Sequence, residues 1–215
     1  MGSDLGRPRI VVATRSAHKL RELRELLHLS RTGLVSLDDV GVADEPVEDG
    51  ATFEANARLK ARFYARLTGL PTLADDSGLE VDALDGGPGV RTRRFASETA
   101  TDEENNTRLL EVLGGLPPPE RGARYVCVLS LVLPDDAGPR GGLPIAAETR
   151  GTCRGRIAAG PRGTGGFGYD PIFEPADEPY GGRTLGLYTP QEKHAISHRA
   201  RAARAMAPRL ERLGF

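Results

Sequence analysis

The sequence predicts an α/β protein, and three observations carry this prediction. Residues 9–14 (RIVVAT) read as a buried strand, and a tight loop leads to residues 18–29, which carry leucines at helical spacing. A second helical pattern over residues 52–68 leads into another short strand at 71–74. Two long strand patterns then follow between residues 123 and 157. Strands and helices therefore share the chain.

The composition is that of a soluble globular protein whose 215 residues can bury the core of a single domain, 1–215, in one body or two closely joined lobes. Because 29 Lys and Arg nearly balance 30 Asp and Glu, no global charge draws the chain to nucleic acid or to a membrane. Cys127 and Cys153 belong to no paired ligand motif, which favours a reducing, cytoplasmic setting. Residues 1–9 lack a signal-peptide core, and the apolar run 125–133 is too short to cross a bilayer.

Two segments in the first third of the chain carry candidate binding residues. Lys19 falls in the first turn of the first predicted helix, where free backbone N–H groups favour anions, so it is a candidate phosphate ligand. An acidic loop at 38–50 precedes the helix at 52–68, on which Asn56 and Lys60 are four residues apart and share one face. A solvated loop and an exposed lysine are the alternatives.

Asp75 and Asp76 follow the strand pattern at 71–74. Side chains alternate along a strand, so the two carboxylates point to opposite faces unless the backbone turns at Ser77-Gly78, as glycine permits. Such a turn would bring both carboxylates onto one divalent cation. A solvated Asp-Ser-Gly turn is the alternative.

The middle of the chain reads as mainly structural. Glycines at 86–89 open a basic loop, Arg91–Arg94, that solvation alone can explain. Residues 101–104 form a capping box that begins a helix, which Gly114 and Gly115 end. The strands at 123–133 and 143–157 flank a turn-rich segment and predict a long hairpin that forms a second lobe.

The glycine-rich segment 160–171 contains a formal G-x-G-x-x-G match at Gly163–Gly168. No long helix can follow it, because the next residues are Tyr-Asp-Pro-Ile-Phe, so a dinucleotide site is rejected; a P-loop motif is also missing from the sequence. What remains is a flexible loop that presents Phe167 beside Asp170, a pair suited to stacking on a flat base and bonding to its edge. The alternative places Phe167 in the core.

The last predicted element begins with a capping box at 189–192 that has proline at the first helical position. His194 and His198 have the spacing of a zinc pair, but the glutamate of H-E-x-x-H is missing, which argues against a metal role. His198 and Arg199 lie at a helix start and offer donors to carbonyl or phosphate oxygens. The Arg- and Ala-rich tail then predicts a surface helix, bent or ended near Pro208.

Four separated segments together resemble the inosine triphosphate pyrophosphatase family, whose members hydrolyse non-standard purine nucleoside triphosphates. They lie through nearly the whole chain, at residues 13–19, 52–60, 74–78, and 163–171 with 193–199. The resemblance implies a mixed, elongated central sheet with two α/β lobes flanking a nucleotide-binding cleft, a homodimer, and a Mg²⁺-dependent reaction. The products would be nucleoside monophosphate and pyrophosphate.

The resemblance also assigns residues to the phosphate end of a nucleotide. Glu48, Asp75 and Asp76 would hold Mg²⁺, and Asp76 would also act as the general base. The residues that would grip phosphates are Lys19, Lys60 and Lys193.

At the base end, the resemblance implies that Phe167 stacks on the purine while Asp170, His198 and Arg199 read its edge. Because His198 and Arg199 serve there as donors, adenine, which presents an amino group in place of the 6-keto oxygen, would be refused. The remaining residues of the expected nucleotide site are Thr14, Ser16, Asn56, Ser77, Gly168 and Tyr169.

Two segments depart from the family's pattern. The family usually has Gly-Asn after the first threonine, whereas this chain has Arg15-Ser16, which replaces an amide with a hydroxyl. The loop at 91–95 reads Arg-Thr-Arg-Arg-Phe where the family usually carries a tyrosine and small residues. Two rival functions stay open: a pyrophosphatase for pyrimidine or modified nucleotides, and a catalytically silent nucleotide-binding protein. An assay of pyrophosphate release across a nucleotide panel separates the three.

Overall fold

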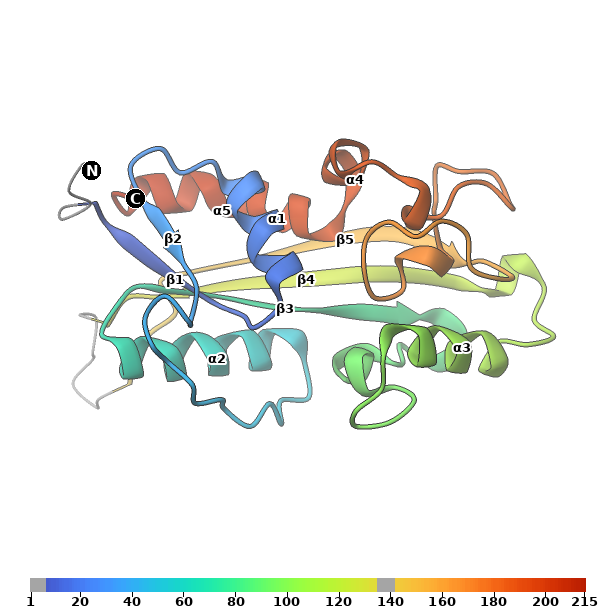
Figure 1. Cartoon of the computed structure of the whole chain (residues 1–215), viewed down its shortest axis with the longest axis horizontal. Helices are drawn as coiled ribbons and strands as arrows, with labels where there is room; N and C mark the ends of the chain where they lie inside the picture. The colour runs from blue at the N-terminus through green and yellow to red at the C-terminus, as the bar shows by residue number, and fades with distance from the viewer. Residues whose placement is uncertain (1–6, 135–141) are drawn as a thin grey trace. The chain divides into compact units, whose positions relative to one another are not determined.

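The computed structural model describes residues 7–134 and 142–215 and confirms the α/β class (Figure 1). Within these residues one mixed sheet has the strand order β2-β1-β3-β4-β5-β6. The strands are β1 (Arg9–Ala13), β2 (Gly33–Val35), β3 (Thr72–Val81), β4 (Gly122–Val132), β5 (Ala147–Ile157) and β6 (Phe173–Pro175). The α-helices are α1 (Ala17–Leu27), α2 (Phe53–Thr68), α3 (Asp102–Val112), α4 (Pro190–Ile196) and α5 (His198–Arg212).

The chain divides into two compact units, each described by itself. Unit 1 comprises residues 1–76, 128–150 and 199–215, and unit 2 comprises residues 77–127 and 151–198. The predicted hairpin is therefore not a lobe of its own, because β4 and β5 each contribute residues to both units. Most of its predicted turn lies outside the described residues. The single-domain arrangement and its cleft stay predictions.

Unit 1 is built on parallel pairing of β1 with both β2 and β3. Helices α1 and α5 cover one face of these strands and α2 covers the other (Figure 1). The buried side of α2 contributes Ala61, Tyr64 and Ala65 to a core that also holds Val11 and Ala74 from the strands. This apolar layer fixes the register of the strand that carries the acidic pair.

Local capping explains most helix boundaries. Thr52 caps α2, and both predicted capping boxes are present, with Thr101 and Glu104 before α3 and Thr189 and Glu192 before α4. Helix α1 ends two residues earlier than predicted because His28 adopts the left-handed conformation, at φ 44° and ψ 43°.

One prediction about the backbone is wrong, and a second is wrong in part. Strand β3 does not turn at Ser77-Gly78 but continues to Val81, and Leu79 and Val81 are fully buried in the core of unit 2. The buried apolar residues beyond the glycine thus hold the segment extended, although glycine alone would permit a turn. Helix α5 continues through Pro208 to Arg212, so it does not end near Pro208, and the alternative of a bend there stays a prediction. None of the helices described is long and apolar enough to cross a membrane.

Candidate functional site

The two adjacent aspartates of β3 lie on opposite faces of the sheet of unit 1. Asp75 contacts Lys19 Nζ of α1 at 2.7 Å and Arg199 Nε of α5 at 2.8 Å. Asp76 contacts Lys60 Nζ of α2 at 2.7 Å. Helices α1 and α5 cover one face and α2 covers the other (Figure 1). The two aspartates meet different helices because successive side chains of a continuous strand point to opposite faces. The expected turn that would bring both carboxylates onto one cation does not form.

Asp75 belongs to a buried group of two acids and two cations. Arg199, which is 1% exposed, donates to Asp75 and also to Glu22 Oε2 of α1 at 2.6 Å. Burial alone would raise the pKa of Asp75, but the charges of Arg199 and Lys19 outweigh it and hold the pKa well below its usual range. Arg199 was predicted to read the base edge, yet its guanidinium is occupied by these two carboxylates. Glu22 was missed, since its partner lies 177 positions away in the sequence.

The face covered by α2 presents a different arrangement, with two carboxylates on one ammonium. Lys60 Nζ contacts Asp76 at 2.7 Å and Glu48, from the acidic loop, at 2.9 Å. Burial would lower the pKa of Lys60, but these two negative charges raise it. Burial raises the pKa of Asp76. The positive charges of Lys60 and Lys19 oppose this rise, and the negative charge of Glu48 adds to it.

The acidic loop is fixed beside α2 by a second predicted residue. Asn56 is 2% exposed, and its Oδ1 accepts the backbone N–H of Gly50 at 2.8 Å. A side chain at Gly50 would collide with this oxygen, since an added Cβ would lie 2.4 Å from it. Asn56 was predicted to bind substrate, and the contact described here is to the loop that carries Glu48.

The donor set on the α2 face fits Mg²⁺ better than the predicted set of three acids. Among residues 7–134 and 142–215, no three His, Cys, Asp or Glu side chains gather as a metal-binding group. Glu48 and Asp76 nevertheless converge on one cationic centre, and Mg²⁺ is commonly held by one or two carboxylates together with water and substrate phosphates. Asp75 fits this role poorly, because both its oxygens face Lys19 or Arg199.

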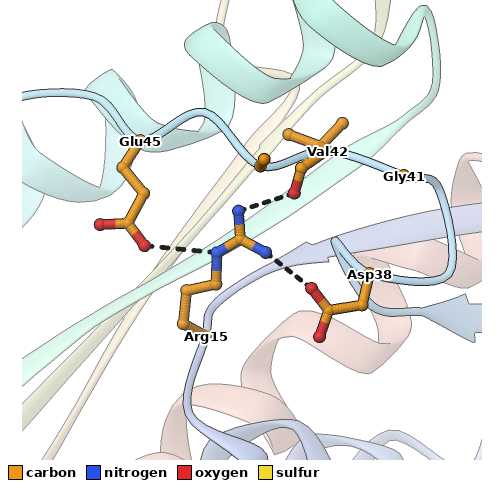
Figure 2. Close-up of a pocket in the computed structure, with 6 residues that line it drawn as sticks. Arg15, Asp38, Gly41, Val42 and Glu45 are labelled. Atoms are coloured by element: carbon orange, nitrogen blue, oxygen red, sulfur yellow. Dashed lines mark hydrogen bonds and ion pairs between the residues drawn. The ribbon is translucent and has the colours of Figure 1, made fainter.

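Arg15, noted in the sequence only as a departure, holds the start of the acidic loop. Figure 2 shows its guanidinium among three acceptors in a pocket of about 450 Å³. It lies 2.8 Å from Asp38 Oδ1, 2.6 Å from the carbonyl oxygen of Val42 and 3.3 Å from Glu45 Oε1. An arginine fork suits such divided contacts. Arg15 thus ties the end of β1 to the acidic loop.

The turn between β1 and α1 is held by its own hydroxyls. Thr14 Oγ1 accepts the N–H of Ser16 at 3.1 Å, and Ser16 caps α1 by accepting the N–H of Lys19 at 3.4 Å. Lys19 therefore lies in the first turn of α1, as predicted, with its ammonium on Asp75. The predicted nucleotide contacts of Thr14 and Ser16 stay predictions.

Unit 2 brings together the aromatic and charged residues of the glycine-rich loop. Lys193 Nζ lies 2.8 Å from Asp170 Oδ2 and 4.5 Å from the centre of the Phe167 ring. The same carboxylate oxygen accepts the N–H of Phe167 at 2.9 Å. Phe167 is half-buried and lies outside the buried core of unit 2, which disfavours the core alternative. Lys193, predicted to grip phosphate, is buried against the residues predicted for the base.

Tyr125 of β4 stacks on His198 and so orients it. The sequence did not indicate this role, because Tyr125 lies within an apolar strand pattern. Its ring stacks on the imidazole of His198, with centroids 4.6 Å apart and planes 8° from parallel. Burial and the charge of Asp170 raise the pKa of Tyr125 well above its usual range, so the phenol stays protonated. Tyr169 was predicted to bind substrate, but it is 3% exposed in the core, and its hydroxyl donates to the Thr92 carbonyl at 2.8 Å.

The sequence matches the profile of the Ham1 family over residues 10–209. It is 43% identical to a dITP/XTP pyrophosphatase of Anaeromyxobacter sp. (strain Fw109-5), covering 95% of this chain and 97% of that protein. It is 46% identical to a dITP/XTP pyrophosphatase of Geobacter sulfurreducens, covering 90% and 92%. A HAM1 protein from Coxiella burnetii superposes with a TM-score of 0.81 at 40% identity, covering 95% of this chain and 99% of that one.

We predict that Asp75→Asn lowers the free energy of unfolding by about 3–5 kcal/mol, because it removes the carboxylate that Lys19 contacts and leaves Arg199 with one carboxylate, Glu22, in place of two. Urea denaturation measures the loss, and Asp76→Asn is the matched control, since Lys60 keeps Glu48 as a partner. The pKa of Asp75 is lower in the folded than in the unfolded chain, where it is about 3.9. The wild-type advantage should therefore be complete above about pH 5 and shrink as pH falls through the lowered pKa. Equal stability of both variants at neutral pH would contradict this.

Proposed function

The chain belongs to the Ham1 family, and on that premise we propose that it hydrolyses non-standard purine nucleoside triphosphates, ITP, dITP and XTP, to nucleoside monophosphate and pyrophosphate. The observation that carries the proposal is the convergence of Glu48 and Asp76 on the Lys60 ammonium. The relatives at 43% and 46% identity are named dITP/XTP pyrophosphatases, which supports the same substrate class. A cytoplasmic location and a homodimer stay predictions.

We assign the phosphate chemistry to residues of unit 1. Lys19 and Lys60 are the cations that would contact phosphate oxygens, and Glu48 with Asp76 would hold Mg²⁺. Bound there, Mg²⁺ would neutralise charge that develops on the phosphate oxygens. Asp76 would accept the proton of the attacking water. Asp75 would act through Lys19 and Arg199 by fixing their positions.

We assign base recognition to residues of unit 2. Phe167 offers a partly exposed ring for stacking on the purine. His198 and Lys193 are the donors of this group that suit a 6-keto oxygen, and adenine would place its amino group against them. Asp170 would set the directions of Phe167 and Lys193, because one of its oxygens accepts from both.

The test of this proposal is pyrophosphate release from ITP, XTP, GTP, ATP and a pyrimidine triphosphate, with and without added Mg²⁺. We expect ITP and XTP to be cleaved and ATP to be cleaved about five- to 150-fold less efficiently, since one unpaired buried donor costs about 1–3 kcal/mol. Chelation of the metal should abolish release. A chain that cleaves ATP as well as ITP, prefers pyrimidines or releases no pyrophosphate would overturn the proposal.

We predict that Asp76→Asn lowers kcat by roughly 10²–10⁴, because the amide cannot accept the proton of water. The fold should persist, as Lys60 keeps its contact with Glu48. Far-ultraviolet circular dichroism checks the fold. A variant with wild-type kcat would remove Asp76 from the role of base.

Phe167→Ala should raise KM for every purine triphosphate by the loss of about 1–3 kcal/mol of stacking while thermal stability stays near wild type. The matched comparison is Phe173→Ala, because Phe173 is fully buried in the core of unit 2 and its truncation should cost about 3–5 kcal/mol of folding stability. Steady-state kinetics and thermal melts separate the two effects. If Phe167→Ala lowers the melting temperature and leaves KM unchanged, Phe167 packs in the core and does not stack on the base.

A further inference from the structure

Helix α3 holds both backbone polar groups of one residue in the base loop, defined here as residues 163–170. The carboxylate of Asp102 accepts the N–H of Gly168 at 2.6 Å. The amide of Asn106 donates from Nδ2 to the carbonyl oxygen of Gly168 at 3.1 Å. Asp102 and Asn106 are four residues apart and so share one face of the helix. The sequence pattern indicated only a structural helix here.

Gly168 links the contacts from Asp102 and Asn106 to the ring of Phe167. It follows Phe167 directly and adopts φ +63°, a conformation that glycine reaches without strain. On the other side, the N–H of Phe167 is held by Asp170. The ring of Phe167 is only partly buried and lies outside the core cluster of unit 2, with the Lys193 ammonium 4.5 Å from its centre. The backbone contacts on either side of Phe167 hold the Cα from which this ring projects.

Asn106 has a buried amide oxygen that makes no hydrogen bond among the described residues, an energetic cost that packing alone does not explain. The residue is 9% exposed, and the unpaired atom is Oδ1. An unsatisfied buried acceptor destabilises a fold, and an apolar side chain of similar size would remove that penalty. The neighbouring Asn105 is different, because both ends of its amide are bonded, to Arg93 and Ala96, and close the loop between them.

We propose that Asp102 and Asn106 are positioning residues for purine recognition, which act by holding Gly168 so that the Phe167 ring is ready to stack. The inference rests on the proposed function, since it gives helix α3 a role in binding the base. It extends that function to a helix with no residue of its own in the predicted site.

The decisive variant is Asn106→Leu, which keeps the volume and removes both the donor and the unpaired acceptor. We expect KM for ITP to rise about three- to tenfold with kcat within about twofold of wild type, because a contact that serves binding alone is lost. The melting temperature should stay the same or rise. A purely structural asparagine would give the reverse, with lower stability and unchanged KM. Asn105→Leu supplies that contrast, and Thr107→Ala, at an exposed position of α3, is the unaffected control.

Asp102 gives an independent test at an exposed position, where substitution leaves the core untouched. Asp102→Ala should raise KM about three- to tenfold, and Asp102→Asn, which keeps an acceptor for the Gly168 N–H, should recover part of the loss. The double variant Asp102→Ala/Asn106→Leu should raise KM by less than the product of the single effects, because both act on one residue. This arm decides the question if Asn106→Leu fails to fold.

Turnover by the wild type distinguishes a failure of the proposed function from a failure of the proposed role of α3. A wild type that releases no pyrophosphate from any purine triphosphate overturns the proposed function. An active wild type with unchanged KM in both Asp102→Ala and Asn106→Leu overturns only the role of α3. A matching rise in the dissociation constant for inosine monophosphate, measured by titration calorimetry, would support the inference without relying on turnover.

Discussion

The site of unit 1 depends on one geometric constraint, the uninterrupted extension of β3. Because consecutive side chains of a strand point to opposite faces, Asp75 and Asp76 are separated by the sheet itself, although they are adjacent in sequence. Each therefore meets a different helix layer. One contacts cations from α1 and α5, and the other contacts the lysine of α2.

The two faces differ in their balance of charge, and this gives them different chemistry. Lys19 and Arg199 are matched by Asp75 and Glu22, so that group is neutral and suited to holding its members in place. On the α2 face, the ammonium of Lys60 contacts two carboxylates, those of Asp76 and Glu48. An excess of carboxylate is what a divalent cation requires, and the loop that supplies Glu48 is tied down by Arg15 and Asn56.

Local signals in the sequence predicted much of the fold and part of the site. The two capping boxes predicted the starts of α3 and α4. The spacing of Asn56 and Lys60 indicated that they share one face of α2, and this face meets the acidic loop. The course of β3 was wrong because the glycine signal is local, whereas the burial of Leu79 and Val81 depends on the rest of unit 2. The contacts of Arg199 with Asp75 and Glu22 could not be predicted for the same reason, as these partners lie 124 and 177 positions away. Its contact with the base edge stays a prediction.

The buried group around Asp75 also bears on how this sequence can change over generations. Its four members come from α1, β3 and α5, and any single loss of charge leaves an opposite charge stranded away from water. Replacement of one member alone would pass through a poorly folded intermediate, whereas paired replacements keep the group neutral. Substitutions at Lys19, Glu22, Asp75 and Arg199 should therefore covary among related sequences, although these positions lie far apart in the chain.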